Sequence, residues 1–170
     1  MNRRSILNIS AAALLGLALL PGSAVAQQKT LKEQLIGTWT LVSADSAKKD
    51  GTKTPFAEGT NLKGLLIFTA NRFSWQIISE FPKLASNDRL KTTPEENKAV
   101  AHSGLSYFGT YTVSETDKIL TSQIERSSFP NQNGIAGKRT ITSVTADELK
   151  FSNPASLAGN KNDFVWKRAN

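Results

Sequence analysis

A single histidine and the absence of cysteine limit the chemistry open to this chain of 170 residues. Without cysteine there is no thiol nucleophile, no disulfide and no cysteine-ligated zinc or iron–sulfur site. One histidine, His102, cannot supply the two or three imidazoles of common metal sites, so we expect no metal and no cofactor. No serine–histidine–aspartate spacing supports catalysis by His102. It lies near the end of a predicted helix, where an imidazolium would complement the helix carbonyls.

Charged residues on two consecutive predicted strands form a second candidate group. They are Glu125, Arg126 and Arg139, on either side of one connection. A charge buried in a barrel is costly unless it is paired. A Glu125–Arg139 pair therefore has two interpretations. It is either a salt bridge at the rim, which contributes little, or a buried anchor for a carboxylate or carbonyl of a ligand.

Three aromatic residues are candidates for the wall of a pocket. Trp75 shares an apolar strand face with Phe73 and Ile77, so it either packs in the core or lines a cavity. Tyr107 and Tyr111 share a face with Gly109, whose missing side chain leaves room for a ligand or marks a bend. If that face points inward, both phenols aim hydrogen bonds into the interior.

Two adjacent glutamates, Glu95 and Glu96, look like a pair of catalytic carboxylates, but a structural role explains them. The sequence from Thr93 to Glu96 is a capping box with proline at the first helical position. We predict that this helix runs from Thr93 to Gly104, where the glycine ends it.

The elements that must position these groups are mostly strands. Eight segments alternate between apolar and polar residues and are separated by turn residues. They are Gly37–Ser43, Gly64–Thr69, Phe73–Ile78, Leu105–Ser114, Ile119–Arg126, Lys138–Thr145, Glu148–Asn153 and Asp163–Arg168. A short helix is expected within Lys29–Ile36, and a long polar loop over Asp45–Leu62.

This order of elements predicts an all-β fold, an eight-stranded up-and-down antiparallel barrel, because closure removes exposed sheet edges. A barrel of eight strands can hold one small ligand. The Thr93–Gly104 helix falls between the third and fourth predicted strands, in a connection longer than a hairpin needs. Its few apolar residues cannot form a core of their own. We therefore expect it to rest on the barrel, as a lid over the mouth or as a permanent brace.

The first 26 residues have the pattern of a signal peptide. Arg3 and Arg4 precede an apolar run, Ile6–Leu20, and Ala24-Val25-Ala26 matches a small-x-small cleavage site. The apolar run is short for a bilayer, so we expect no stable membrane insertion after cleavage. The arginine pair suits both Sec and twin-arginine export. We expect a mature domain, residues 27–170, in the bacterial periplasm or secreted.

The net charge of +7 raises the question of a nucleic-acid partner. The lysines are scattered along the chain, and no run of five basic residues or nucleic-acid motif accompanies them. We therefore expect a solvated basic surface and no nucleic acid.

Several motifs together resemble a known family. Gly37-Thr38-Trp39, after a short helix, is similar to the Gly-x-Trp signature that opens the first strand of lipocalins. Arg168, two residues after Trp166, resembles the lipocalin arginine that lies over the tryptophan of the Gly-x-Trp signature, here Trp39. Closer matches to the lipocalin-like domain family, a branch of the calycin-type barrels, are Gly64–Thr69, Gly109–Tyr111 and Ser128–Gly134. The resemblance implies that Gly37, Trp39 and Arg168 close the barrel floor, with the guanidinium stacked on the indole.

The strand pattern and the resemblance leave three hypotheses about function open. The leading one is a binding protein that holds a small hydrophobic or amphipathic molecule in the barrel. Its candidate ligand-binding residues are Trp75, Tyr107, Tyr111, Glu125, Arg139 and His102. The second is a cofactor-independent isomerase, cyclase or hydratase acting on a small metabolite. The third is a structural or protein-interaction module whose barrel is filled with side chains. The residues favour binding over catalysis.

Overall fold

The computed structural model describes residues 29–169, and the predicted signal peptide, residues 1–26, lies outside the described residues. Within that range the chain forms strands, two α-helices and one turn of 3₁₀ helix. The strands are β1 (Gly37–Ala47), β2 (Lys53–Thr54), β3 (Thr60–Phe68), β4 (Arg72–Glu80), β5 (Gly104–Ser114), β6 (Ile119–Ser127), β7 (Ala136–Val144), β8 (Glu148–Asn153) and β9 (Lys161–Arg168). The helices are α1 (Leu31–Leu35), α2 (Pro94–His102) and η1 (Pro130–Gln132).

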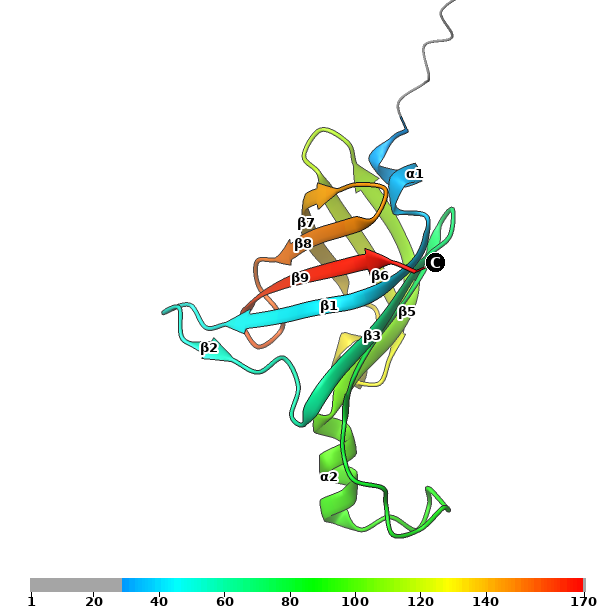
Figure 1. The fold of residues 1–170 in the computed structure, drawn as a ribbon, viewed down its shortest axis with the longest axis vertical. Helices are drawn as coiled ribbons and strands as arrows, with labels where there is room; N and C mark the ends of the chain where they lie inside the picture. The colour runs from blue at the N-terminus through cyan, green and yellow to red at the C-terminus, as the bar shows by residue number, and fades with distance from the viewer. Residues whose placement is uncertain (1–28, 170) are drawn as a thin grey trace, which may run out of the picture.

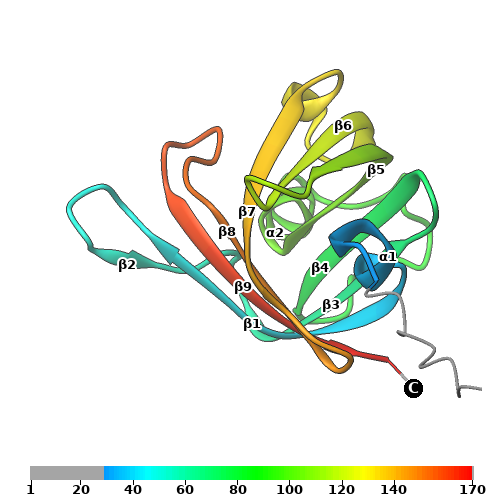
Figure 2. The same ribbon diagram turned by 90° about the horizontal axis from the view of Figure 1, so that it is seen from above.

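The strands form one antiparallel sheet that closes on itself. Apart from β2, neighbours along the chain are neighbours in the sheet, and β1 also pairs with β9. That pairing runs from Trp39 opposite Arg168 to Ala47 opposite Lys161. Figure 1 shows β1 and β9 side by side, and Figure 2 shows the strands surrounding a common interior. The expected all-β, eight-stranded up-and-down barrel is confirmed.

Two details differ from the expectation. The predicted loop over 45–62 is wrong at both ends, because β1 continues to Ala47 and β3 begins at Thr60. Hydrogen bonding to β9 along the whole of β1 holds this polar stretch extended, and β2 adds a short hairpin on its end. The helix α2 follows the third barrel strand as expected. Counting β2, it lies between the fourth and fifth strands, β4 and β5.

The helix α1 covers the end of the barrel at which β1 begins. Thr30 caps it with a capping box, and Leu35 at its end is fully buried. The Leu31 and Lys32 N–H groups donate to the carboxylate of Glu115, in the turn between β5 and β6, at 2.8 and 3.2 Å. These bonds use two of the helix donors that have no partner within the helix, and they fix α1 to the opposite side of the barrel.

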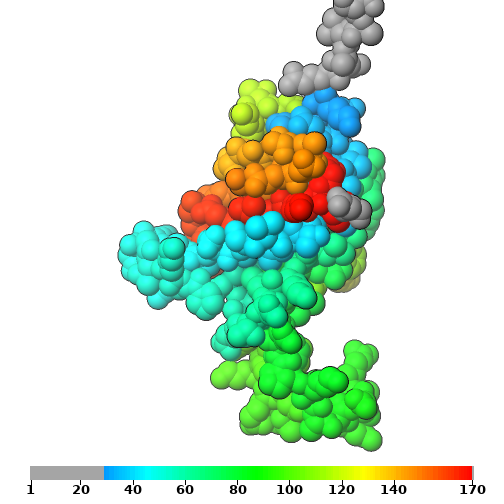
Figure 3. Space-filling view, viewed as in Figure 1, coloured from blue at the N-terminus to red at the C-terminus, as the bar shows by residue number. Residues whose placement is uncertain are grey.

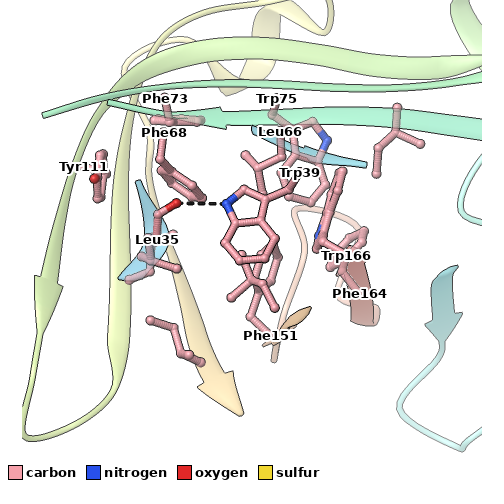
Figure 4. Packing of buried hydrophobic residues seen from close by; sticks show 14 of the residues in the cluster. Leu35, Trp39, Leu66, Phe68, Phe73, Trp75, Tyr111, Phe151, Phe164 and Trp166 are labelled. Carbon is pink, nitrogen blue, oxygen red and sulfur yellow. Dashed lines mark hydrogen bonds between the residues drawn. The ribbon is translucent and has the colours of Figure 1, made fainter. Parts of the chain in front are cut away.

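Trp39 lies at the centre of this closed end (Figure 4). Its side chain is fully buried, and its indole N–H donates to the Leu35 carbonyl at 2.8 Å. The Arg168 guanidinium lies 4.0 Å from the centre of the indole ring and donates to the carbonyls of Gln34, Ile36 and Ala146. Arg168 therefore ties the last strand to the chain around α1.

Gly37 allows this close approach. Its φ of +131° disfavours other residues, and an added Cβ would lie 2.7 Å from Arg168 Nη1.

The last residue of α2 meets the loop before β3, where the His102 carbonyl accepts from the Glu58 N–H at 3.0 Å. Among the described residues, the expectation that the helix rests on the barrel holds at this end alone. None of its residues is buried, and Figures 1 and 3 show it projecting from one end of the barrel together with the loop before it. Local hydrogen bonds hold the segment instead. Thr93 and Glu96 form the predicted capping box, and the Glu96 carboxylate also accepts from the Ala85 N–H at 2.7 Å.

Deleting residues 83–101 and joining the ends by a short turn is expected to leave a cooperatively folded barrel. Exposed residues away from packing contacts each contribute within about 0.5 kcal/mol, so we expect a small change in the free energy of unfolding. Urea denaturation followed by circular dichroism measures it. A broad, non-cooperative transition in the variant would show that α2 belongs to the folding unit.

Candidate functional site

The barrel interior is filled at one end and hollow at the other. Towards α1, buried apolar side chains fill it, among them Trp39, Leu66 and Phe68. At the opposite end lies an open cavity of about 740 Å³. Its wall includes the aromatic side chains Phe56, Trp75, Tyr107, Phe129 and Phe164. A barrel filled along its whole length, as the third hypothesis required, is not what the structure shows.

Arg139, from β7, is the charged residue at the boundary between the two halves. It lines the open cavity and also a small void above the filled end. The residue is only 8% exposed. Its Nη1 donates to Ser122 Oγ at 3.0 Å and its Nη2 to the Tyr107 hydroxyl at 2.6 Å, whereas its Nε has no partner among the described residues.

No carboxylate compensates the Arg139 charge: none of the salt bridges found within residues 29–169 includes it. Three aromatic rings surround the guanidinium carbon instead. Their centroids lie 5.1 Å away for Trp75, 5.8 Å for Tyr107 and 5.9 Å for Phe151. Cation–π attraction offsets part of the lost hydration. Arginine keeps its proton in proteins, so the cavity base holds a permanent positive charge.

Tyr107, from β5, acts at this site as a neutral phenol. Burial raises its pKa to about 12, although the nearby Arg139 charge acts in the opposite direction. Its oxygen accepts the hydrogen bond from Arg139, and no acceptor for its own proton occurs in the described part of the chain. The Tyr107 hydroxyl can therefore donate one hydrogen bond to a ligand.

The raised pKa of Tyr107 makes the protein less stable at alkaline pH. Between the ordinary pKa of 10.0 and about 12, the unfolded state releases this proton while the folded state keeps it. The folded state then binds more protons, so the free energy of unfolding falls as pH rises. We expect Tyr107→Phe to reduce this fall by up to about 1.4 kcal/mol per pH unit. Urea denaturation at several pH values in that window tests it, and equal slopes in both proteins would contradict it.

Trp75, from β4, lies beside Arg139 and lines the cavity. Its ring stacks on Tyr107 with centroids 5.5 Å apart, and the edge-on ring of Phe164 lies 4.8 Å away. Its indole N–H is buried and has no partner among the described residues. Trp75 therefore both packs in the aromatic cluster and presents a ring to the cavity.

Tyr111 points inward but lies in the filled half, so it does not line the cavity. Its hydroxyl donates to the Thr69 carbonyl at 2.7 Å, and its ring packs 4.8 Å from that of Phe68. Burial raises its pKa as well. Gly109, on the same strand, lies at a register shift: Phe108 pairs with Arg126 and Gly109 with Ile124, so Glu125 is an extra residue in β6. A Cβ on Gly109 would collide with the Gln123 carbonyl.

Glu125 does not pair with Arg139, which corrects that hypothesis. Glu125 is the residue of β6 that the pairing with β5 skips, and its side chain reaches the outer face, where the exposed Arg72 of β4 lies. There it forms a salt bridge of 2.7 Å with Arg72, and both side chains are about half exposed. Glu125 is therefore a surface residue.

His102 lies at the mouth of the cavity, exposed at the end of α2. Its Nδ1 is 2.8 Å from Glu58 Oε1. The four residues considered for catalysis, Glu125, His102, Tyr111 and Arg139, thus occupy the outer surface, the mouth, the filled half and the cavity base. They do not converge on one reacting position, so the arrangement does not support the enzyme hypothesis.

The model of a family described as a lipocalin-like domain matches residues 36–169. The chain belongs to this family. Among solved structures, a lipocalin-like protein from Bacteroides uniformis shares 12% identity, with a TM-score of 0.43 over 80% of this chain and 99% of that one. A designed fluorescence-activating β-barrel shares 14% identity, with a TM-score of 0.44 over 84% and 100% of the two chains.

The crustacyanin barrels show a similar level of likeness to this lipocalin-like domain. Lobster apocrustacyanin A1 shares 12% identity, with a TM-score of 0.39 over 80% of this chain and 61% of that one. No curated protein matches the chain. Within residues 29–169, no three metal-ligating side chains gather in one place, and no helix has the length and apolar character of a membrane span.

Sequence reasoning missed several cavity residues of the lipocalin-like domain, among them Asn162 and Phe164 on β9. Asn162 is buried, and its Oδ1 has no partner within the described range. Both share a face of β9 with Arg168, which the family resemblance placed over Trp39. Extending the alternation of faces backward along the strand would have identified them.

Proposed function

We propose that this lipocalin-like domain binds a small amphipathic molecule inside the barrel. The supporting observation is the open cavity of about 740 Å³, with aromatic walls and partly unpaired polar groups at its base. Ligand pockets combine apolar walls with a few placed polar groups in this way. The aromatic walls suit an apolar body, and the base around Arg139 suits a polar head.

The unpaired polar atoms support binding over a purely structural role. Arg139 Nε, Trp75 Nε1 and Asn162 Oδ1 belong to cavity-lining residues, and each is buried without a partner among residues 29–169. A buried polar atom without a hydrogen bond costs about 1–3 kcal/mol. Neighbouring side chains cover these atoms, so a ligand recovers that loss where a side chain rotates to expose them.

We propose further that the domain acts after export, with residues 1–26 removed as a signal peptide. The basic, apolar and small-x-small segments of the sequence support this. Expression of the full chain in a bacterium, followed by fractionation and N-terminal sequencing, tests it. A mature protein that begins near Gln27 in the periplasmic fraction or medium is expected, and an uncleaved cytoplasmic chain would contradict it.

Binding can be tested with N-phenylnaphthylamine, an uncharged aromatic probe that fluoresces in apolar surroundings. Leu105 on β5 lines the cavity, so Leu105→Trp places an indole inside it. Phe108, on the same strand, is exposed and serves as the matched control in Phe108→Trp. We expect the wild type and the control to bind the probe alike, and Leu105→Trp to bind about tenfold more weakly, a loss of about 1.4 kcal/mol.

The same titration can also contradict the proposed binding function. No saturable binding to wild type would count against the proposed cavity. Equal binding by Leu105→Trp and wild type would show that the probe occupies another surface.

A further inference from the structure

The base of the cavity presents more hydrogen-bond donors than acceptors. A guanidinium carries five N–H groups. Among the described residues, Nη1 and Nη2 of Arg139 each have one hydrogen-bond acceptor, and Nε has none. The Tyr107 hydroxyl proton and the Trp75 indole N–H add two more donors. Against these donors, one cavity-lining acceptor, Asn162 Oδ1, is unpaired among the described residues. The complementary ligand group is therefore rich in acceptors.

The charge at the cavity base also favours a ligand group that is rich in acceptors and negatively charged. Of the residues described as lining the cavity, Glu58 is the one carboxylate, and it lies exposed at the mouth beside His102. The cations Arg139 and Lys138 line the same cavity. A buried charge is strongly destabilising unless an opposite charge meets it. Since no protein group neutralises Arg139, the ligand is the available source of negative charge.

We propose that the ligand carries a carboxylate that binds Arg139 and Tyr107 at the base of the cavity, a proposal that rests on the function proposed above. One guanidinium balances one negative charge, so a monoanion fits better than a dianion. The planar guanidinium matches the two oxygens of a carboxylate, and the neutral Tyr107 hydroxyl can donate a further bond. The ligand class is then a small organic acid with an apolar body that lies along the aromatic wall.

The acid group can be tested by competition against N-phenylnaphthylamine. Decanoate and decanol share one chain and differ in the head group, and each displaces the probe if it enters the cavity. We expect wild type to prefer decanoate by about tenfold or more, because its carboxylate accepts charge-assisted hydrogen bonds that the decanol hydroxyl does not match. In Arg139→Met this preference should disappear, while the probe and decanol still bind.

Two further variants separate charge at this site from charge in general. Arg126 on β6 is exposed and contacts the Glu125 carbonyl, so Arg126→Met removes the same charge outside the cavity and should keep the preference. Tyr107→Phe retains Arg139 and removes one donor, and should lower the preference several-fold. It also provides a readout if Arg139→Met does not fold.

The outcomes are distinguishable. If the probe binds wild type but decanoate and decanol compete equally, the carboxylate proposal fails and the binding function stands. A preference that survives in both Arg139→Met and Tyr107→Phe would also overturn it. If neither the probe nor either competitor binds wild type, the binding function fails and this proposal with it.

Discussion

Replacing Trp39 with alanine is expected to destabilise the barrel by about 3–5 kcal/mol, the usual cost of truncating a buried aromatic residue. Trp39 is fully buried at the closed end, so the change leaves a cavity in the packed half. It also removes the donor for the Leu35 carbonyl and the ring on which Arg168 lies. Together these contacts join α1, β1 and β9. A loss of this size is a large part of the stability of a typical domain.

Trp39→Phe is the informative control. It keeps an aromatic ring below Arg168 but cannot donate to the Leu35 carbonyl, so we expect a smaller loss than for alanine. Urea denaturation, followed by circular dichroism and by fluorescence, gives both free energies of unfolding. If Trp39→Ala cost less than about 1 kcal/mol, the closed end would not depend on this residue.

Much of the barrel could be predicted because its strands alternate regularly between apolar and polar residues. All eight predicted strands lie within or overlap observed ones. Strand length was harder to predict. The Asp45–Ala47 end of β1 is polar, and it is extended because β9 lies beside it. A pairing between the first and last strands of a barrel leaves no signal within either strand alone.

The candidate site was harder to predict because its residues depend on which face of each strand points inward. In β6, Ile119 and Leu120 are both apolar and adjacent, so alternation does not decide between the two faces. The opposite choice would have placed Glu125 inside with Arg139. Depth along the barrel is a second unknown: Tyr107 and Tyr111 share a face, yet one reaches the cavity and the other the filled end.

Arg139→Met is expected to make the free protein more stable, by about 1–4 kcal/mol, the range seen when buried ion pairs are replaced by apolar groups of similar size. Methionine can fill part of the same space among Trp75, Tyr107 and Phe151 without a charge that needs compensation. Ser122 keeps its hydrogen bond to the Gly137 carbonyl. The variant also leaves the buried Tyr107 hydroxyl without its hydrogen bond to Arg139, which costs about 1–3 kcal/mol and offsets part of this gain.

The sign of this change distinguishes the two roles that Arg139 can have. If its hydrogen bonds and aromatic contacts mainly hold the strands together, Arg139→Met lowers the free energy of unfolding. If the charge is kept for a ligand, stability rises while affinity for decanoate falls, because binding residues are often retained at the expense of stability. Urea denaturation without ligand measures the first quantity, with Arg126→Met as the surface control. Added decanoate should then stabilise wild type more than Arg139→Met, since a ligand stabilises the state that binds it.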